Sequence, residues 1–190
     1  QTLIADGLHF AGHDVTTLDV GSAAGTHLKT SLADLQKLGV DQVALSGTAL
    51  GQPLELSLGG ETLDAAVAAG LPEFGRLDGG TFTQGGVDVT LDVGVDALSG
   101  LTSADAAALA GAGVDEVKVD VADQAGFDAL FTNPALESDL AALGSSGLAG
   151  DLQRGVTLDI QSGSVTLTDA EAQTLIADGL HFAGHDVTTL

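Results

Sequence analysis

The sequence contains no cysteine, tryptophan, tyrosine or methionine, and only three prolines in 190 residues. Without cysteine, the chain can form no disulfide framework, no thiolate metal site and no cysteine nucleophile. It also lacks any run of about eighteen uncharged apolar residues, which a membrane-spanning helix requires. We therefore expect no insertion into a membrane.

Positive charge is equally scarce. Five lysines and arginines face 27 aspartates and glutamates, which gives a formal net charge of −22 at pH 7. Such a surface repels nucleic acid and anionic membranes, so neither is expected as a partner. It attracts divalent cations and keeps a long chain soluble. The composition leaves open whether the carboxylates serve solubility alone or a specific cation.

An exact repeat of one end dominates what is present. The segment QTLIADGLHFAGHDVTTL forms Gln1–Leu18 and returns unchanged as Gln173–Leu190, 172 residues later. The identity indicates recent copying, homogenisation by recombination, or an engineered duplication of one end. We interpret the chain as a window from a tandem array, because internal repeats decide the fold before other patterns do. Residues 1–172 make one full period and residues 173–190 begin the next, so Asp-Val is expected to follow Leu190.

Shorter units recur inside this period. A helical pattern that ends at glycine and leads into an alternating strand is found four times, at Ser31–Gly47, Glu61–Phe74, Leu101–Val121 and Leu167–Leu190. We expect the helices to begin after hydroxyl N-caps, namely Ser31, Ser103 and Thr168. They are expected to stop at glycines that can take the left-handed conformation, namely Gly7, Gly39, Gly70, Gly113 and Gly179.

The expected strands alternate apolar and polar residues. Val117, Val119 and Val121 share one face, for example, and Glu116, Lys118 and Asp120 share the other. Alternation indicates a sheet with one buried face and one wet face. The predicted fold class is therefore α+β, in which repeated βαβ-type helix–strand units form two-layer sheets with helices on one face, in a tandem-repeat array.

The order of elements predicts two sub-units within the period. Residues 1–98 read as a split βαβ unit, and residues 99–172 read as helix, strand, helices and strand. A helical pair is expected around Phe127–Leu143, interrupted at Asn133-Pro134 because the residue before proline is pushed out of helical geometry.

Histidines provide one candidate metal site. His9 and His13, repeated as His181 and His185, have the i, i+4 spacing of a helical zinc pair. Glycines bracket them, however, so the segment is predicted to be a helix-to-strand turn, and no third ligand is evident. A role at the surface or in packing between repeats is the alternative.

The acidic strand faces provide the second candidate, because hard cations such as calcium take several oxygen ligands. The candidate calcium ligands are Asp88, Asp92, Asp96, Asp115, Glu116, Asp120 and Asp123. Neither the EF-hand loop pattern nor the glycine- and aspartate-rich nonapeptide of calcium-binding β-helices is present. Calcium is the one cofactor that the sequence admits, and no motif requires it.

Catalytic motifs are absent from the sequence. The glycine-rich segment Gly79–Gly86 lacks the Lys-Ser/Thr of a phosphate loop, and Gly144–Gly147 is not a nucleophile elbow. We therefore expect the protein not to be an enzyme.

The chain resembles the repeat regions of giant bacterial secreted and surface proteins, of adhesin-like or surface-layer-like type. The resemblance rests on the long identical repeat, the acidic cysteine-free composition and the recurring pattern LTxADAxxLxxxGVDxVxV. It identifies a style of protein and implies an extracellular or cell-surface location.

Two functions are compatible with these observations. The first is a structural repeat of an extracellular fibre, stalk, filament or surface layer, whose partners are neighbouring repeats and identical chains. The alternative is an adhesin module that binds a glycan, a surface or calcium.

Overall fold

A computed structural model describes residues 17–20, 29–45, 54–75, 89–145, 155–183 and 187–189 of the chain. The strands are β1 (Thr17–Val20), β2 (Lys29–Ser31), β3 (Gln42–Leu45), β4 (Leu54–Ser57), β5 (Glu73–Gly75), β6 (Val89–Gly94), β7 (Glu116–Val121), β8 (Gly155–Ile160), β9 (Ser164–Thr166), β10 (Leu180–Phe182) and β11 (Val187–Thr189). The helices are α2 (Leu32–Leu38), α3 (Leu63–Ala68), α4 (Ser103–Gly111), α5 (Gln124–Thr132), α6 (Pro134–Ser145), α8 (Asp169–Ala177) and the 3₁₀ helix η1 (Val95–Leu98).

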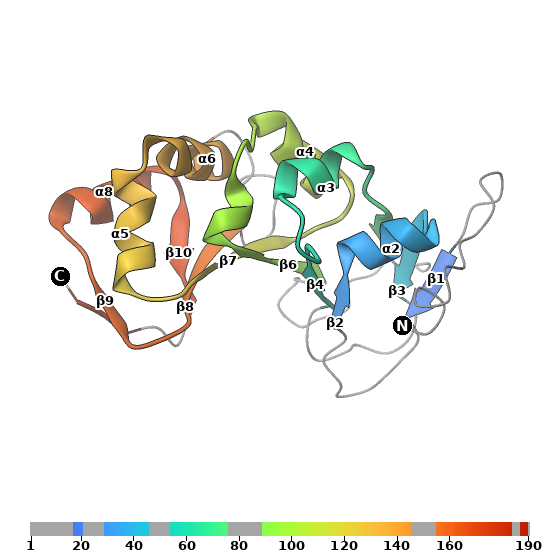
Figure 1. Cartoon of the computed structure of the whole chain (residues 1–190), viewed down its shortest axis with the longest axis horizontal. Coiled ribbons are helices and arrows are strands. Elements are labelled where there is room, and N and C mark those ends of the chain that lie inside the picture. The colour runs from blue at the N-terminus through green and yellow to red at the C-terminus, as the bar shows by residue number, and fades with distance from the viewer. Residues whose placement is uncertain are drawn as a thin grey trace.

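The main sheet has six strands in the order β10-β8-β7-β6-β4-β2. This is the order in which those strands follow one another along the chain, and every pair is parallel. Two smaller parallel sheets, β1-β3-β5 and β11-β9, accompany it. In Figure 1 the six strands therefore follow one another along the long axis of the molecule.

This topology makes the fold α/β and corrects the expected α+β class. The consecutive strands β3 and β4 belong to different sheets, so the split βαβ sheet expected for residues 1–98 is not formed by the described strands. The pairing of β6 with β7 also joins the two expected sub-units. Parallel neighbours need crossover connections, and the helices supply most of them here.

Among the described residues, helices cover the apolar face of the sheet. Helices α2, α3, α4 and α6 lie along the same side of the six strands (Figure 1). A row of directly paired residues, all buried, faces them: Leu56, Leu91, Val117, Val156 and Leu180. The small aliphatic side chains on this face form the core, as alternation predicted.

Most helix boundaries lie where the sequence places them. Ser31 and Thr168 cap α2 and α8, and Thr168 forms a capping box with Glu171. The expected cap Ser103 is wrong by one residue, because Thr102 caps α4 and forms its box with Asp105. The helical pair and its break are confirmed, since Asn133 is extended before Pro134.

One local feature differs from the expected pattern. Strand β6 ends at Gly94, and Val95–Leu98 form the 3₁₀ helix η1, although the alternation continues through Val95. A 3₁₀ turn brings residues three apart onto one side, so Val95 and the fully buried Leu98 both reach the core. Period-two alternation cannot distinguish that turn from one more strand residue.

Candidate functional site: the polar face of the sheet

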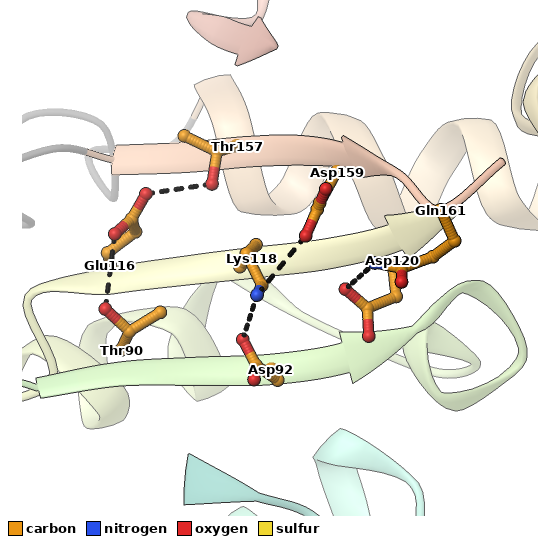
Figure 2. A network of polar contacts seen from close by, with 8 residues as sticks. All are labelled: Thr90, Asp92, Glu116, Lys118, Asp120, Thr157, Asp159 and Gln161. Atoms are coloured by element: carbon orange, nitrogen blue, oxygen red, sulfur yellow. Dashed lines mark hydrogen bonds and ion pairs between the residues drawn. The ribbon is translucent and has the colours of Figure 1, made fainter. Parts of the chain in front are cut away.

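The face of the sheet opposite the helices carries the polar residues of the alternating strands. Strand register places them in rows that run across the sheet. One row pairs Glu55 with Thr90 and Thr90 with Glu116. The next row runs through Ser57, Asp92, Lys118, Thr157 and His181. We call the group drawn in Figure 2 the polar ladder: Thr90, Asp92, Glu116, Lys118, Asp120, Thr157, Asp159 and Gln161.

Lys118 is the centre of the polar ladder. Its Nζ lies 3.0 Å from Oδ1 of Asp92 on β6 and 3.3 Å from Oδ2 of Asp159 on β8 (Figure 2). Burial lowers the pKa of Lys118, but the bond and charge of Asp92, the bond of Asp159 and the charge of Asp120 outweigh it and raise the pKa above its usual value. The ammonium therefore stays charged and joins three neighbouring strands.

Glu116 makes an equivalent connection one row away. Its Oε2 accepts a hydrogen bond of 3.2 Å from the Thr90 hydroxyl, and its Oε1 accepts one of 2.9 Å from the Thr157 hydroxyl. Figure 2 shows these bonds reaching β6 on one side and β8 on the other. Both carboxylate oxygens are thus occupied by the neighbouring strands.

Asp120 completes the ladder at the carboxyl end of β7. Gln161 Nε2 donates to its Oδ1 at 3.0 Å. Burial raises the pKa of Asp120; the positive charge of Lys118 opposes that effect, and the negative charges of Asp92 and Asp159 add to it. Asp92 and Asp159 contact Lys118 directly, and Asp120 interacts with it through charge alone.

The structure therefore brings some of the candidate calcium ligands together and separates others. Asp92, Glu116 and Asp120 lie in the polar ladder. Asp115 instead accepts the Val89 backbone N–H at 3.0 Å, and Asp123 caps α5 by accepting the Gly126 N–H at 3.0 Å. The remaining two are Asp96, exposed on η1, and Asp88, which lies outside the described residues.

No group of three or more histidine or acidic side chains suited to hold a metal ion occurs among the described residues. The calcium ligand set stays a prediction. Five of its seven members, namely Asp92, Asp115, Glu116, Asp120 and Asp123, have a hydrogen-bond or ion-pair partner within the protein.

Of the four candidate histidines, only His181 is described. It lies on strand β10, where its side chain is exposed and its backbone pairs in register with Thr157. The expected helix-to-strand turn is thus wrong at this residue, since the strand begins directly after Gly179. His9, His13 and His185 lie outside the described residues.

Two glutamines that sequence reasoning missed connect successive units. The side-chain amide of Gln124 accepts from the Thr166 N–H at 2.7 Å and donates to the Thr166 carbonyl at 3.0 Å, as a neighbouring strand would. Gln36 Nε2 on α2 donates at 2.8 Å to the carbonyls of Ala66 and Gly70, at the end of α3. An isolated glutamine has no spacing signal, so no sequence pattern marks these contacts.

Comparison with known proteins leaves the chain without an assigned family, because no protein-family model and no curated protein sequence matches it. In the part of the chain that the structure describes, no helix has the length and apolar character needed to cross a membrane.

Proposed function

We propose that this chain is a structural tandem repeat, a segment of an extracellular or cell-surface fibre, stalk, filament or layer that supplies length and cohesion between repeats. The observation that carries the proposal is the order of the six-stranded sheet, in which all pairs are parallel and each strand follows its neighbour along the chain. A sheet built in this way can be extended by adding units at an end, as in repeat proteins whose units contact only their neighbours.

The 18-residue identity supports the same proposal. Identical repeats produce identical interfaces, and a head-to-tail interface that is repeated without closure generates a rod. The partners in this proposal are neighbouring repeats of the same chain and, in a filament, identical chains. The net charge of −22 keeps neighbouring rods apart and disfavours nucleic acid as a partner.

The polar ladder also supports a structural role. The Lys118 ammonium forms ion pairs with β6 and β8, and the Glu116 carboxylate accepts hydrogen bonds from the same two strands. These side chains therefore link β6, β7 and β8. The proposal assigns no catalytic role to the chain. The extracellular location rests on the resemblance in composition and repeat pattern described above.

Chains of one, two and three repeats test the proposal by small-angle X-ray scattering. A structural repeat should lengthen the particle by a constant increment with each added period, at a constant cross-section. Particles that remain compact, or whose longest dimension does not grow in equal steps, would overturn it.

The alternative is an adhesin module that binds a glycan, a surface or calcium, and the exposed His181 beside the polar ladder is the observation that favours it. The test is the unfolding temperature in CaCl₂ and in MgCl₂ of equal ionic strength, and with a panel of glycans. A larger rise in calcium, or a rise with one glycan, would support binding. Equal shifts in both salts and none with glycans would count against it.

A further inference from the structure

We propose that β10 forms a parallel pair with the next repeat's counterpart of β2, so that the six-stranded sheet continues without interruption from one repeat into the next. This inference rests on the tandem array proposed above and specifies the contact that joins its units. The strand that pairs with the outer edge of β10 is thus the segment of the next repeat that is equivalent to Lys29–Ser31.

The sheet itself supplies the first argument. Among the described strands, β2 and β10 are the outermost members of the sheet, and Figure 1 shows β10 to the left and β2 to the right of β7 and β6. Both run in the common direction of the sheet, because every described pair is parallel. Adding the next β2 beside β10 therefore repeats the existing rule that each strand of this sheet pairs with the next strand of the same sheet along the chain.

The two smaller sheets supply an independent argument. Thr189, the last residue of β11, corresponds in the repeat to Thr17, the first residue of β1. β11 pairs with β9 of the same repeat, whereas β1 pairs with β3. In an array, β11 of one repeat and β1 of the next are therefore successive parts of one segment. This segment pairs first with β9 of the first repeat and then with β3 of the next repeat. The next repeat is thereby placed against the last units of this one.

The facing of side chains fixes the register. Leu180 faces the core opposite Val156, in the row that contains Leu56 and, on β2, Thr30. Side chains alternate between the two faces of a sheet, so a core-facing residue of β10 must pair with a core-facing residue of the added strand. Leu180 should therefore lie opposite the next Thr30, and His181 opposite the next Ser31.

This junction predicts a definite repeat length. One period contributes six described strands to the sheet, and six spacings of about 4.8 Å give about 29 Å per repeat. A separate globule of 172 residues would have a diameter of about 40 Å from its expected radius of gyration. The increment per repeat therefore distinguishes a continuous sheet from beads joined end to end.

Amide hydrogen exchange in a two-repeat chain (residues 1–190 followed by a second copy of 19–190) tests the pairing directly. The Ala183 N–H donates to the Leu158 carbonyl at 2.8 Å, toward β8. Successive amides of a strand point to opposite edges, so the Phe182 N–H points toward the proposed partner. In the first copy its exchange should slow by about 100-fold or more relative to the single-repeat chain. Ala183 should be protected in both chains, and Phe182 of the second copy should remain fast.

Engineered cysteines provide a second measurement, because the natural chain has none. His181→Cys in the first copy and Ser31→Cys in the second should form a disulfide under mild oxidation. The same two substitutions placed in one copy are the control, since five strand spacings, about 24 Å, separate them and a disulfide needs Cα atoms within about 7 Å.

The outcomes separate the two proposals. Fast exchange at Phe182 of the first copy, in a two-repeat chain whose Ala183 is protected, would overturn the junction, as would failure of the cross-copy disulfide in a folded chain. If such a chain still lengthens in equal steps of about 40 Å, the spacer function stands and only the continuous sheet fails. If the particle does not lengthen, the proposed function fails.

Discussion

Lys118 is one of only five lysines and arginines, and it contacts a carboxylate on each neighbouring strand. Its side chain is 25% exposed and those of Asp92 and Asp159 are 19% and 26% exposed, so solvent weakens but does not cancel the attraction. Lys118→Met leaves three carboxylates close together without their cation. We expect a loss of about 1–2 kcal/mol in the free energy of unfolding, measured by urea denaturation.

Two further variants make this test specific. Lys118→Arg keeps the charge and should retain most of the stability. Lys37→Met, in the exposed last turn of α2, should change it by less than about 0.5 kcal/mol. Equal losses for the two methionine variants would contradict a central role for Lys118.

Asp139 on α6 is a buried carboxylate, only 7% exposed. Burial raises its pKa, although the backbone N–H groups of Gly100 and Leu101 donate hydrogen bonds that lower it, and the charge of Asp64 raises it further. The folded state therefore holds the proton more tightly than the unfolded state does. Stability should fall as pH rises from the unfolded pKa of about 3.9 to the folded pKa, and then level off.

Asp139→Asn removes this dependence while its Oδ1 still accepts the two amides. We expect the variant to gain stability relative to the natural chain as the pH is raised from about 4 to 7. Urea denaturation at several pH values measures the difference. Asp128→Asn on α5, where the side chain is exposed and asparagine can still accept from Gln124, is the control for the substitution itself. Parallel pH profiles for Asp139→Asn and the natural chain would contradict the prediction.

The sequence predicts which residues lie on the polar face of the sheet, but it does not predict which of their side chains contact one another. Alternation alone places Asp92, Glu116 and Lys118 on the polar face of the sheet. The contact of Lys118 with Asp159 is diagonal, because Lys118 pairs in register with Thr157. That register depends on the long connection between β7 and β8, and alternation within each strand does not predict it. Asp96 was predicted to lie on a strand face but lies on the 3₁₀ helix η1, because the apolar–polar alternation continues for one residue into that helix.

The contact between α4 and β5 depends on a glycine. Gly113 has a φ of 93°, and a Cβ there would lie 2.3 Å from the Phe74 carbonyl oxygen. The Phe74 N–H donates to the Ala112 carbonyl at 2.7 Å, so the backbones cannot separate without losing that bond. Gly113→Ala should therefore lower the free energy of unfolding by about 2 kcal/mol or more.

Gly111, at the end of α4, is the matched control. A Cβ there meets nothing within 4 Å, and its φ is not positive. Gly111→Ala should stabilise the protein by about 0.5–1 kcal/mol, because alanine loses less conformational entropy in a helix. A stabilising Gly113→Ala, or a similar loss for both variants, would show that the close approach to Phe74 is not limiting.

At the level of elements, the sequence determined the one-sided sheet but not its strand direction. Alternation in β7 and β8 correctly indicated one buried apolar face and one polar face, and the polar side chains of these two strands are half-buried. That pattern is more typical of antiparallel sheets, because most parallel sheets are covered on both faces. Here α2, α3, α4 and α6 lie on the apolar face of a parallel sheet whose other face carries polar side chains. Whether neighbouring strands run parallel depends on the crossover connections between them, and the periodicity within a strand does not predict those connections.

The whole molecule carries far more negative than positive charge, and its self-repulsion should depend on salt. Screening by NaCl weakens the repulsion among 27 carboxylates and also weakens the contacts of a few cations. The repulsion involves many more charges, so we expect the unfolding temperature to rise by several degrees between about 10 mM and 0.5 M NaCl. Circular dichroism melts measure the shift, and a fall in unfolding temperature would contradict this balance.

The sequential sheet also determines how such a chain can fold as it is delivered. Leu56 pairs with Leu91, 35 residues later, and Val117 pairs with Val156, 39 residues later, so each strand of this sheet finds its partner within a short stretch of chain. Folding rates depend on this separation, and in a sequential array it does not grow with the number of repeats. A chain emerging from a narrow exit could therefore complete each layer before the next one appears, and its folded end could grow steadily outward.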